Sequence, residues 1–76
     1  MMEEGFHFKL RGAIYEVIPE EEGTYTIFKM AEEYLLITKL KGKKWVRIDY
    51  KTDEPVIEDN DEVEDIGSII DRYVRG

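Results

Sequence analysis

Apolar and polar residues alternate along the first two thirds of the chain in five short stretches. These stretches are rich in β-branched and aromatic residues, the composition that favours strands. They cover residues 6–10, 13–18, 24–30, 34–40 and 45–50. Glycine or proline stands near their ends, as expected for tight turns between strands. The pattern therefore predicts an antiparallel β-meander.

The first two stretches predict a hairpin with a two-residue turn at Arg11-Gly12. This turn pairs Leu10 with Ala13, and the following apolar pairs then all share one face of the sheet. They are Phe8 with Tyr15 and Phe6 with Val17. His7 lies opposite Glu16 on the other face, which is a favourable cross-strand pair.

The fourth and fifth stretches predict a second hairpin, centred on Gly42-Lys43. In that register one face carries the core pairs Lys39 with Val46, Ile37 with Ile48, and Leu35 with Tyr50. The opposite face carries Leu40 with Trp45, Thr38 with Arg47, and Leu36 with Asp49. The stretch 24–30 has no fixed register, because a slip of one residue decides whether Ile27 or Phe28 faces the core.

The end of the chain has the spacing of an amphipathic helix over about residues 60–74. Its apolar stripe comprises Val63, Ile66, Ile69, Ile70, Tyr73 and Val74. Asp59 with Glu62, or Asp61 with Glu64, provides a capping box. Gly67 lies in the middle of this helix at a cost of about 1 kcal/mol relative to alanine, which predicts close approach to the sheet.

Strands grouped first and a helix last predict an α+β fold, an antiparallel β-meander of four to five strands with one C-terminal helix packed across one face. The expected single domain spans residues 1–76, with the meander at about 6–50, a crossover at 51–58 and the helix at about 60–74. The alternative is a small β-barrel carrying a C-terminal helix.

Composition excludes several classes of protein. The chain has 76 residues, no cysteine and one histidine, His7. Disulfides, thiolate metal sites and two-histidine metal sites are therefore excluded. The longest apolar run, residues 34–37, is far shorter than a membrane span. We expect no membrane partner and a cytoplasmic location, unless a leader peptide has been removed.

The sequence predicts no catalytic residue, no cofactor and no metal ligand. The acidic segment beginning at Asp59 resembles a calcium-binding loop, but Val63 and Glu64 stand where that loop needs an Asp or Asn and a glycine. His7 with Glu16 is best interpreted as a surface pair. The chain has one serine, one asparagine and no glutamine, so side chains that orient substrates are scarce. We expect a protein that is not an enzyme.

Charge is segregated along the chain, whose net charge is −7. Residues 39–51 contain six basic residues and one acidic residue, whereas residues 52–71 contain nine acidic residues and no basic one. Lysines commonly protect an exposed edge strand, and the overall negative charge repels nucleic acid. Direct nucleic-acid binding is therefore not expected.

The face of the sheet that the helix leaves uncovered is the predicted interaction surface. The predicted registers place five candidate residues there: Ile14, Leu36, Leu40, Trp45 and Arg47. A contiguous exposed apolar surface usually marks a binding or oligomer site. We therefore expect a protein-interaction module that binds a protein partner or itself. The alternative is an acidic mimic of nucleic acid that inhibits a nucleic-acid-binding protein.

Overall fold

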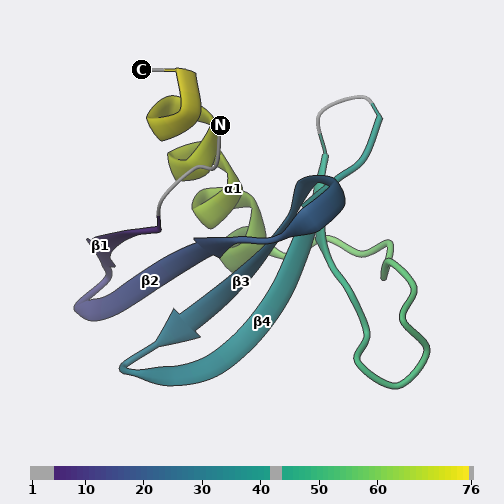
Figure 1. Cartoon of the computed structure of the whole chain (residues 1–76), viewed down its shortest axis with the longest axis horizontal. Helices are drawn as coiled ribbons and strands as arrows, with labels where there is room; N and C mark the ends of the chain where they lie inside the picture. Colours follow the sequence, from purple (N-terminus) through teal and green to yellow (C-terminus); the bar gives the residue numbers. More distant parts are fainter. Residues whose placement is uncertain (1–4, 42–43, 76) are drawn as a thin grey trace.

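The chain forms one open antiparallel sheet followed by a C-terminal helix (Figure 1). The computed structural model describes residues 5–41 and 44–75. Within them the elements are β1 (Phe6–Leu10), β2 (Ala13–Pro19), the 3-10 helix η1 (Glu21–Gly23), β3 (Thr24–Lys29), β4 (Glu32–Lys39), β5 (Trp45–Arg47) and α1 (Asp61–Arg75). Strand order follows chain order, which confirms the predicted α+β meander; the sheet stays open rather than closing as a barrel.

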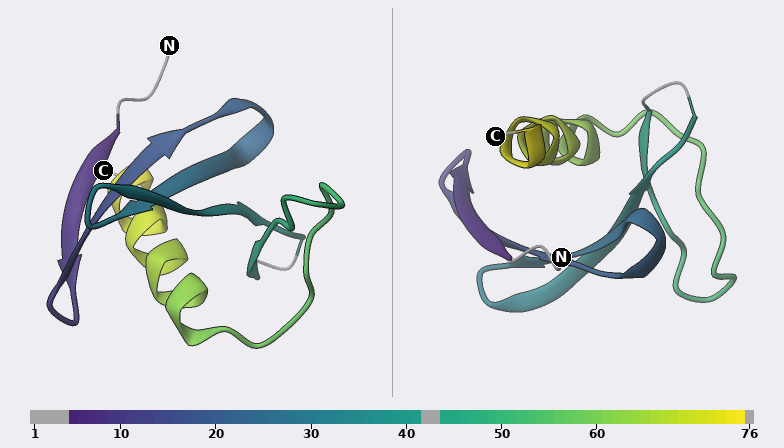
Figure 2. Two further views of the ribbon diagram at one scale, coloured as in Figure 1. Left: turned by 90° about the horizontal axis from the view of Figure 1, so that it is seen from below. Right: turned by 45° about the horizontal axis from the view of Figure 1, so that its top comes forward.

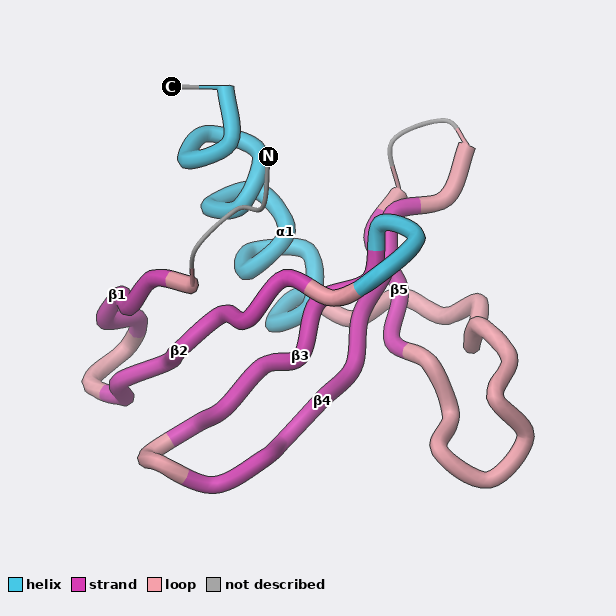
Figure 3. The backbone as a smooth tube through the Cα atoms, viewed as in Figure 1, coloured by secondary structure: helices cyan, strands magenta, loops and turns pink. Residues whose placement is uncertain are grey.

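The sheet curls around α1, which lies on its concave side (Figure 2). A loop that spans residues 48–60 connects β5 to α1 (Figure 3). This loop is fastened near its start by a bridge between Ile48 and Pro55, and by the Val56 amide donating to the Arg47 carbonyl at 2.9 Å. Ile48 is thus bridged to the loop while its amide still donates to the Leu36 carbonyl of β4 at 2.7 Å, and β5 ends at Arg47, earlier than predicted.

The first hairpin has the predicted register throughout, from Leu10 opposite Ala13 to Phe6 opposite Val17. Arg11 and Gly12 both have positive φ, as in the two-residue turns that match the twist of paired strands. His7 lies opposite Glu16, and their side chains approach to 3.9 Å.

Strand β3 places Ile27 in the core and Phe28 on the opposite face, which settles the register that the sequence left open. Ile27 is fully buried and pairs with Leu35 of β4. The next pair is Phe28 with Glu33, so β4 contains one extra residue, Tyr34, at a bulge. Such a bulge redirects the side chain of the extra residue.

The predicted register of β4 with β5 is wrong by one residue. Trp45 lies opposite Lys39, and Arg47 lies opposite Ile37. The amide of Leu40 donates to the carbonyl of Lys44, so the connection contains one residue more than the predicted two-residue turn. Gly42 and Lys43, on which that turn was centred, lie outside the described residues. A slip of one residue reverses the face of every side chain in β5.

Helix α1 is capped by Asn60 rather than by either predicted capping box. The Asn60 side-chain oxygen accepts a hydrogen bond from the Val63 amide at 3.1 Å, and its carbonyl accepts one from the Glu64 amide at 3.0 Å. Asn is among the best residues at this position, because its side chain satisfies an amide that the helix leaves free.

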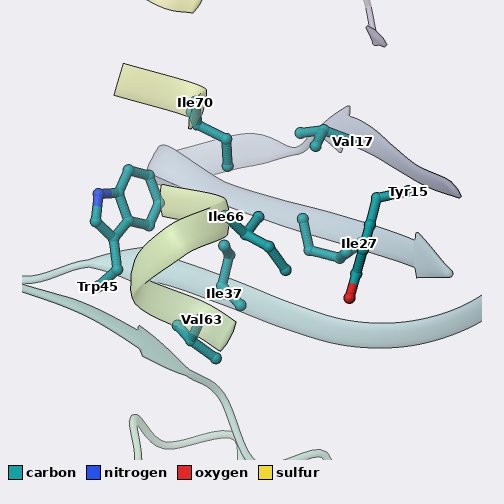
Figure 4. Packing of buried hydrophobic residues seen from close by; sticks show 8 residues of the cluster. All are labelled: Tyr15, Val17, Ile27, Ile37, Trp45, Val63, Ile66 and Ile70. Atoms are coloured by element: carbon teal, nitrogen blue, oxygen red, sulfur yellow. The ribbon is translucent and has the colours of Figure 1, made fainter. Parts of the chain in front are cut away.

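The core lies between the concave face of the sheet and α1 (Figure 4). Its buried members are Tyr15, Val17, Ile27, Ile37, Trp45, Val63, Ile66 and Ile70. Phe6 and Phe8 are partly buried against this cluster. The predicted core members Ile48 and Tyr73 differ: Ile48 is not part of the cluster, and Tyr73 is 54% exposed although its ring stacks on Phe6. The side chain of Val74 lies outside the described part.

The indole of Trp45 packs directly on the helix at Gly67. A Cβ atom at position 67 would overlap the indole ring, so only glycine permits this approach. The indole N–H donates to Asp71, one turn further along α1, at 3.2 Å. The predicted close approach at Gly67 is therefore confirmed, and Trp45 is the side chain that requires it.

Gly67→Ala is expected to destabilise the protein, although alanine normally stabilises a helix. The new methyl group would overlap a rigid, buried ring, and overpacking of this kind costs about 1–3 kcal/mol. Urea denaturation measures the change. Ser68→Ala, at the neighbouring exposed position, is the control and should be neutral or slightly stabilising. An unchanged midpoint for Gly67→Ala would contradict the tight contact.

Ile70→Asp is expected to unfold the domain, because it places a charge without a partner in the core. Ile70 is 1% exposed in α1, whereas Ile57, in the preceding loop, is 68% exposed. Ile57→Asp is therefore the matched control and should change the free energy of unfolding by less than about 0.5 kcal/mol. Thermal melting followed by circular dichroism distinguishes them. Equal melting of Ile70→Asp and the parent protein would mean that α1 is not docked.

Candidate functional site

Two of the five predicted surface residues lie on the wrong face. Trp45 is only 5% exposed and belongs to the core. Arg47 shares the concave face with it, and its guanidinium donates to Glu58 at 3.0 Å. The cause is the one-residue slip between β4 and β5. Among the other three, Ile14 is 53% exposed, and Leu36 and Leu40 are half-buried.

The observed strand pairs show which residues lie on the outer, convex face of the sheet. Moving along the strands, its first row contains Lys9, Ile14 and Met30, and its second row contains His7, Glu16, Phe28 and Glu33. The third row contains Ile18, Thr26 and Leu36, and the fourth contains Thr24, Thr38 and Val46. Val46 is 2% exposed, so the β5 end of this face is already covered within the chain. The accessible apolar surface therefore lies nearer β2 and β3.

Ile14 and Met30 are the most exposed large apolar residues of this face. Ile14 is 53% exposed and Met30 is 61% exposed. The Met30 amide donates to the Ile14 carbonyl at 2.9 Å, and the Met30 sulfur lies 3.4 Å from the Ile14 nitrogen. Phe28 is half-buried in the next row of the same strand pair. We call Ile14, Met30 and Phe28 the outer patch.

The threonine side chains of the outer face are engaged within the chain. The hydroxyls of Thr24 and Thr38 donate to backbone carbonyls of residues 21 and 23, at 2.7 and 3.3 Å. Thr26 donates to the Glu20 carboxylate at 2.9 Å. The hydroxyls of these threonines are thus directed to the connection between β2 and β3.

A second cluster joins α1 to the concave face through the Glu62 carboxylate. Glu62 accepts hydrogen bonds from the hydroxyls of Tyr15 at 2.6 Å and Tyr34 at 2.7 Å, and from the Lys29 ammonium at 3.1 Å. The ammonium also lies over the Tyr34 ring, 4.8 Å from its centre. Tyr34 reaches Glu62 from the bulge in β4. Sequence patterns missed this cluster, because neither the bulge nor its side-chain directions leave a signal in residue spacing.

Charges in the Glu62 cluster are fixed at neutral pH. Burial by itself raises the pKa of Glu62, but the hydrogen bonds from Tyr15, Tyr34 and Lys29 outweigh burial and lower that pKa below 4.5. The hydrogen bond to Glu62 raises the pKa of Lys29 to about 12. Burial raises the pKa of Tyr15, and the hydrogen bond to Glu62 raises that of Tyr34. These shifts favour the ionised carboxylate and ammonium, whose ion pair fastens α1 to the sheet.

Further carboxylates of α1 and the preceding loop also face basic side chains of the sheet. Asp71 binds the Lys39 ammonium at 2.8 Å, and Glu64 binds that of Lys44 at 3.3 Å. Asp65 binds the Arg11 guanidinium. Bases of the basic segment therefore pair with acids of the acidic segment across the interface between helix and sheet.

Comparisons with protein-family models, with curated proteins and with solved structures find no match. In the part of the chain that the structure describes, no cluster of three or more His, Cys, Asp or Glu side chains is arranged to hold a metal ion. No helix formed by the described residues is both long and apolar enough to cross a membrane. A functional proposal therefore has to come from the surfaces described above.

Glu62→Gln is expected to remove part of the acid sensitivity of the protein. Because the pKa of Glu62 is lower when folded than its usual 4.5, its ionised form stabilises the fold above about pH 4.5. That stabilisation is lost as the pH falls through the folded pKa. At pH 7 the free energy of unfolding of the variant should be about 2 kcal/mol lower, and this difference should shrink as the pH falls below the folded pKa of Glu62.

Urea denaturation at several pH values measures this difference, with Asp61→Asn as the matched control. Asp61 is the neighbouring exposed carboxylate in the same helical turn. A constant offset between Glu62→Gln and the parent protein at every pH would show that the charge of Glu62 contributes nothing.

Proposed function

We propose that this chain is a non-enzymatic protein-interaction module that binds a protein partner through the outer face of its sheet. The observation that carries the proposal is the outer patch, whose Ile14 and Met30 are more than half exposed. Large exposed apolar side chains that lie together usually mark an interaction surface. The helix covers only the concave face, so the rest of the fold leaves this patch accessible.

The charge of the outer face supports the same proposal. Charged residues make up 38% of the sequence, yet on the outer face of β2, β3 and β4 they are Glu16 and Glu33. Each has a partner within the chain: Glu16 faces His7, and Glu33 accepts a hydrogen bond from the Tyr50 hydroxyl at 3.0 Å. The centres of protein interfaces are likewise depleted of charge.

The shape of the face indicates what kind of partner fits it. The sheet curls around α1, so the outer face is convex (Figure 2). A partner with a shallow concave surface would contact more of it than a flat or convex partner would. A cytoplasmic location, predicted from the sequence, is compatible with this proposal and stays a prediction.

The alternative function, an acidic mimic of nucleic acid, receives less support. That function requires a negative surface free to meet a basic partner. The carboxylates of Glu58, Glu62, Glu64, Asp65 and Asp71 instead bind basic side chains of the same chain. Their field at a distance is correspondingly reduced.

Ile14→Lys is expected to abolish partner binding while leaving the protein folded, because Ile14 is exposed and contributes little to the core. The tagged protein is used to retain partners from a cell lysate at low and at high salt. Apolar binding persists at high salt, whereas binding by a charged mimic weakens steeply. Ile57→Lys is the control, because Ile57 is an exposed apolar residue outside the outer patch. This variant should retain every partner.

Two results would contradict the proposal. The same partners could be retained by the parent protein and by Ile14→Lys, or they could all be released at high salt. The second result would favour the acidic mimic.

A further inference from the structure

The free edge of β1 is a second surface capable of binding. Strand β1 is the terminal strand of the open sheet and is hydrogen-bonded to β2. Both residues of its turn, Arg11 and Gly12, have positive φ, with φ of 51° and 83°. In a two-residue hairpin of this kind, the residues that flank the turn exchange both hydrogen bonds. The backbone N–H and C=O groups of Leu10 and Phe8 therefore point toward β2.

The N–H and C=O groups of successive residues point to opposite sides of a strand. Those of His7 and Lys9 therefore point away from β2, toward the free edge. The other strand shows the same alternation, because the Ile14 carbonyl, opposite Lys9, accepts its hydrogen bond from β3 at Met30. Within the described residues, no backbone group outside the sheet bonds to His7 or Lys9. The edge thus offers two N–H donors and two C=O acceptors.

The side chains along this edge set what an added strand can carry. Lys9 is exposed on the outer face and carries a positive charge, and His7, also exposed there, faces Glu16 of β2. Opposite charges on neighbouring strands attract, and like charges repel. On the other face, Phe8 and Leu10 are only partly buried, so apolar side chains of an added strand would extend the core.

A second copy of this chain is a poor occupant of the edge. Two copies of β1 paired antiparallel about Lys9 would place the two lysines opposite one another. An exposed lysine on an edge strand is a known protection against such self-pairing. The same charge attracts a strand that carries carboxylates.

We propose that the free edge of β1 binds an extended segment of a partner protein in which acidic and apolar residues alternate. The backbone of the segment pairs with His7 and Lys9, a carboxylate of the segment lies beside the Lys9 ammonium, and its apolar residues cover Phe8 and Leu10. Strand addition at an open sheet edge is a recurring mode of peptide recognition. This surface is distinct from the outer patch and does not depend on it.

A capped seven-residue peptide of alternating valine and glutamate tests the proposal, with a matched peptide that has lysine in place of glutamate. The full-length protein is titrated with each peptide, and its backbone amides are followed by NMR. With the glutamate peptide, the amide signals of His7 and Lys9 should shift, and their hydrogen exchange should slow by about tenfold. The lysine peptide should bind more weakly.

Two variants of Lys9 separate the backbone contribution from the charge. Lys9→Pro removes the donor at the free edge, where proline is tolerated, and should weaken binding at least about fivefold, which corresponds to about 1 kcal/mol. Lys9→Glu keeps the amide and should reverse the preference, so that the lysine peptide binds better. Circular dichroism verifies that both variants are folded.

Other outcomes overturn edge binding and remain distinguishable from a failure of the proposed function. Shifts confined to Ile14 and Phe28 would place the peptide on the outer patch and contradict the β1 site alone. Equal binding of both peptides would contradict the selection for acidic residues. Unchanged exchange at His7 and Lys9 would exclude strand addition, whatever the lysate experiment gives.

Discussion

The contact between Trp45 and Gly67 fixes the relation between the sheet and the helix. A glycine within a helix costs about 1 kcal/mol relative to alanine. Here it lets a buried indole reach the helix backbone, and a large aromatic side chain buries enough apolar area to outweigh that cost. Because Trp45 must face α1, the whole of β5 takes the register that directs its odd-numbered residues to the concave face, Arg47 among them. The close contact also brings the indole N–H to Asp71, one turn from Gly67, which fixes the rotation of the helix about its own axis.

Ion pairs between the sheet and α1 add to this apolar contact and favour one orientation of the helix. The segregation of basic and acidic residues in the sequence could indicate an external partner of either sign. In the structure, bases of the sheet bind acids of α1 and of the loop before it, at both ends of the interface. A half-exposed ion pair contributes little to stability, typically 0–1 kcal/mol. The pairs therefore select one orientation of the helix more than they hold it in place. The more enclosed Glu62 cluster differs, because one carboxylate there satisfies two hydroxyls and an ammonium together.

Residues whose neighbours follow from local spacing were predicted well. Two independent patterns, a turn at Arg11-Gly12 and the alternation around it, specify the first hairpin, and the helical stripe correctly placed Ile66 and Ile70 in the core. The register predicted for the second hairpin was wrong. It depends on the number of residues in the connection, and the sequence is compatible with more than one such number. That single residue placed Trp45 and Arg47 on the wrong face. Tyr34 could not be predicted to meet Glu62, because a bulge changes the direction of one side chain without changing the pattern around it. Of the candidate surface residues, Ile14, Leu36 and Leu40 are exposed or half-buried as their predicted position on the outer face requires, and their role in binding stays a prediction.

The turn between β3 and β4 gives an independent reason to regard the outer patch as functional. Met30 and Ala31 have φ of 53° and 70°, in the left-handed region where glycine and asparagine are the usual residues. Each residue with a Cβ costs roughly 1 kcal/mol or more there. A turn selected for stability alone would carry Asn-Gly at these positions, and it would not expose a methionine. Local rules of this kind are broken mainly at functional sites, where another requirement outweighs stability. The strain at Met30 keeps a flexible apolar side chain beside Ile14, on the part of the sheet that the helix does not cover, where we propose that a partner binds.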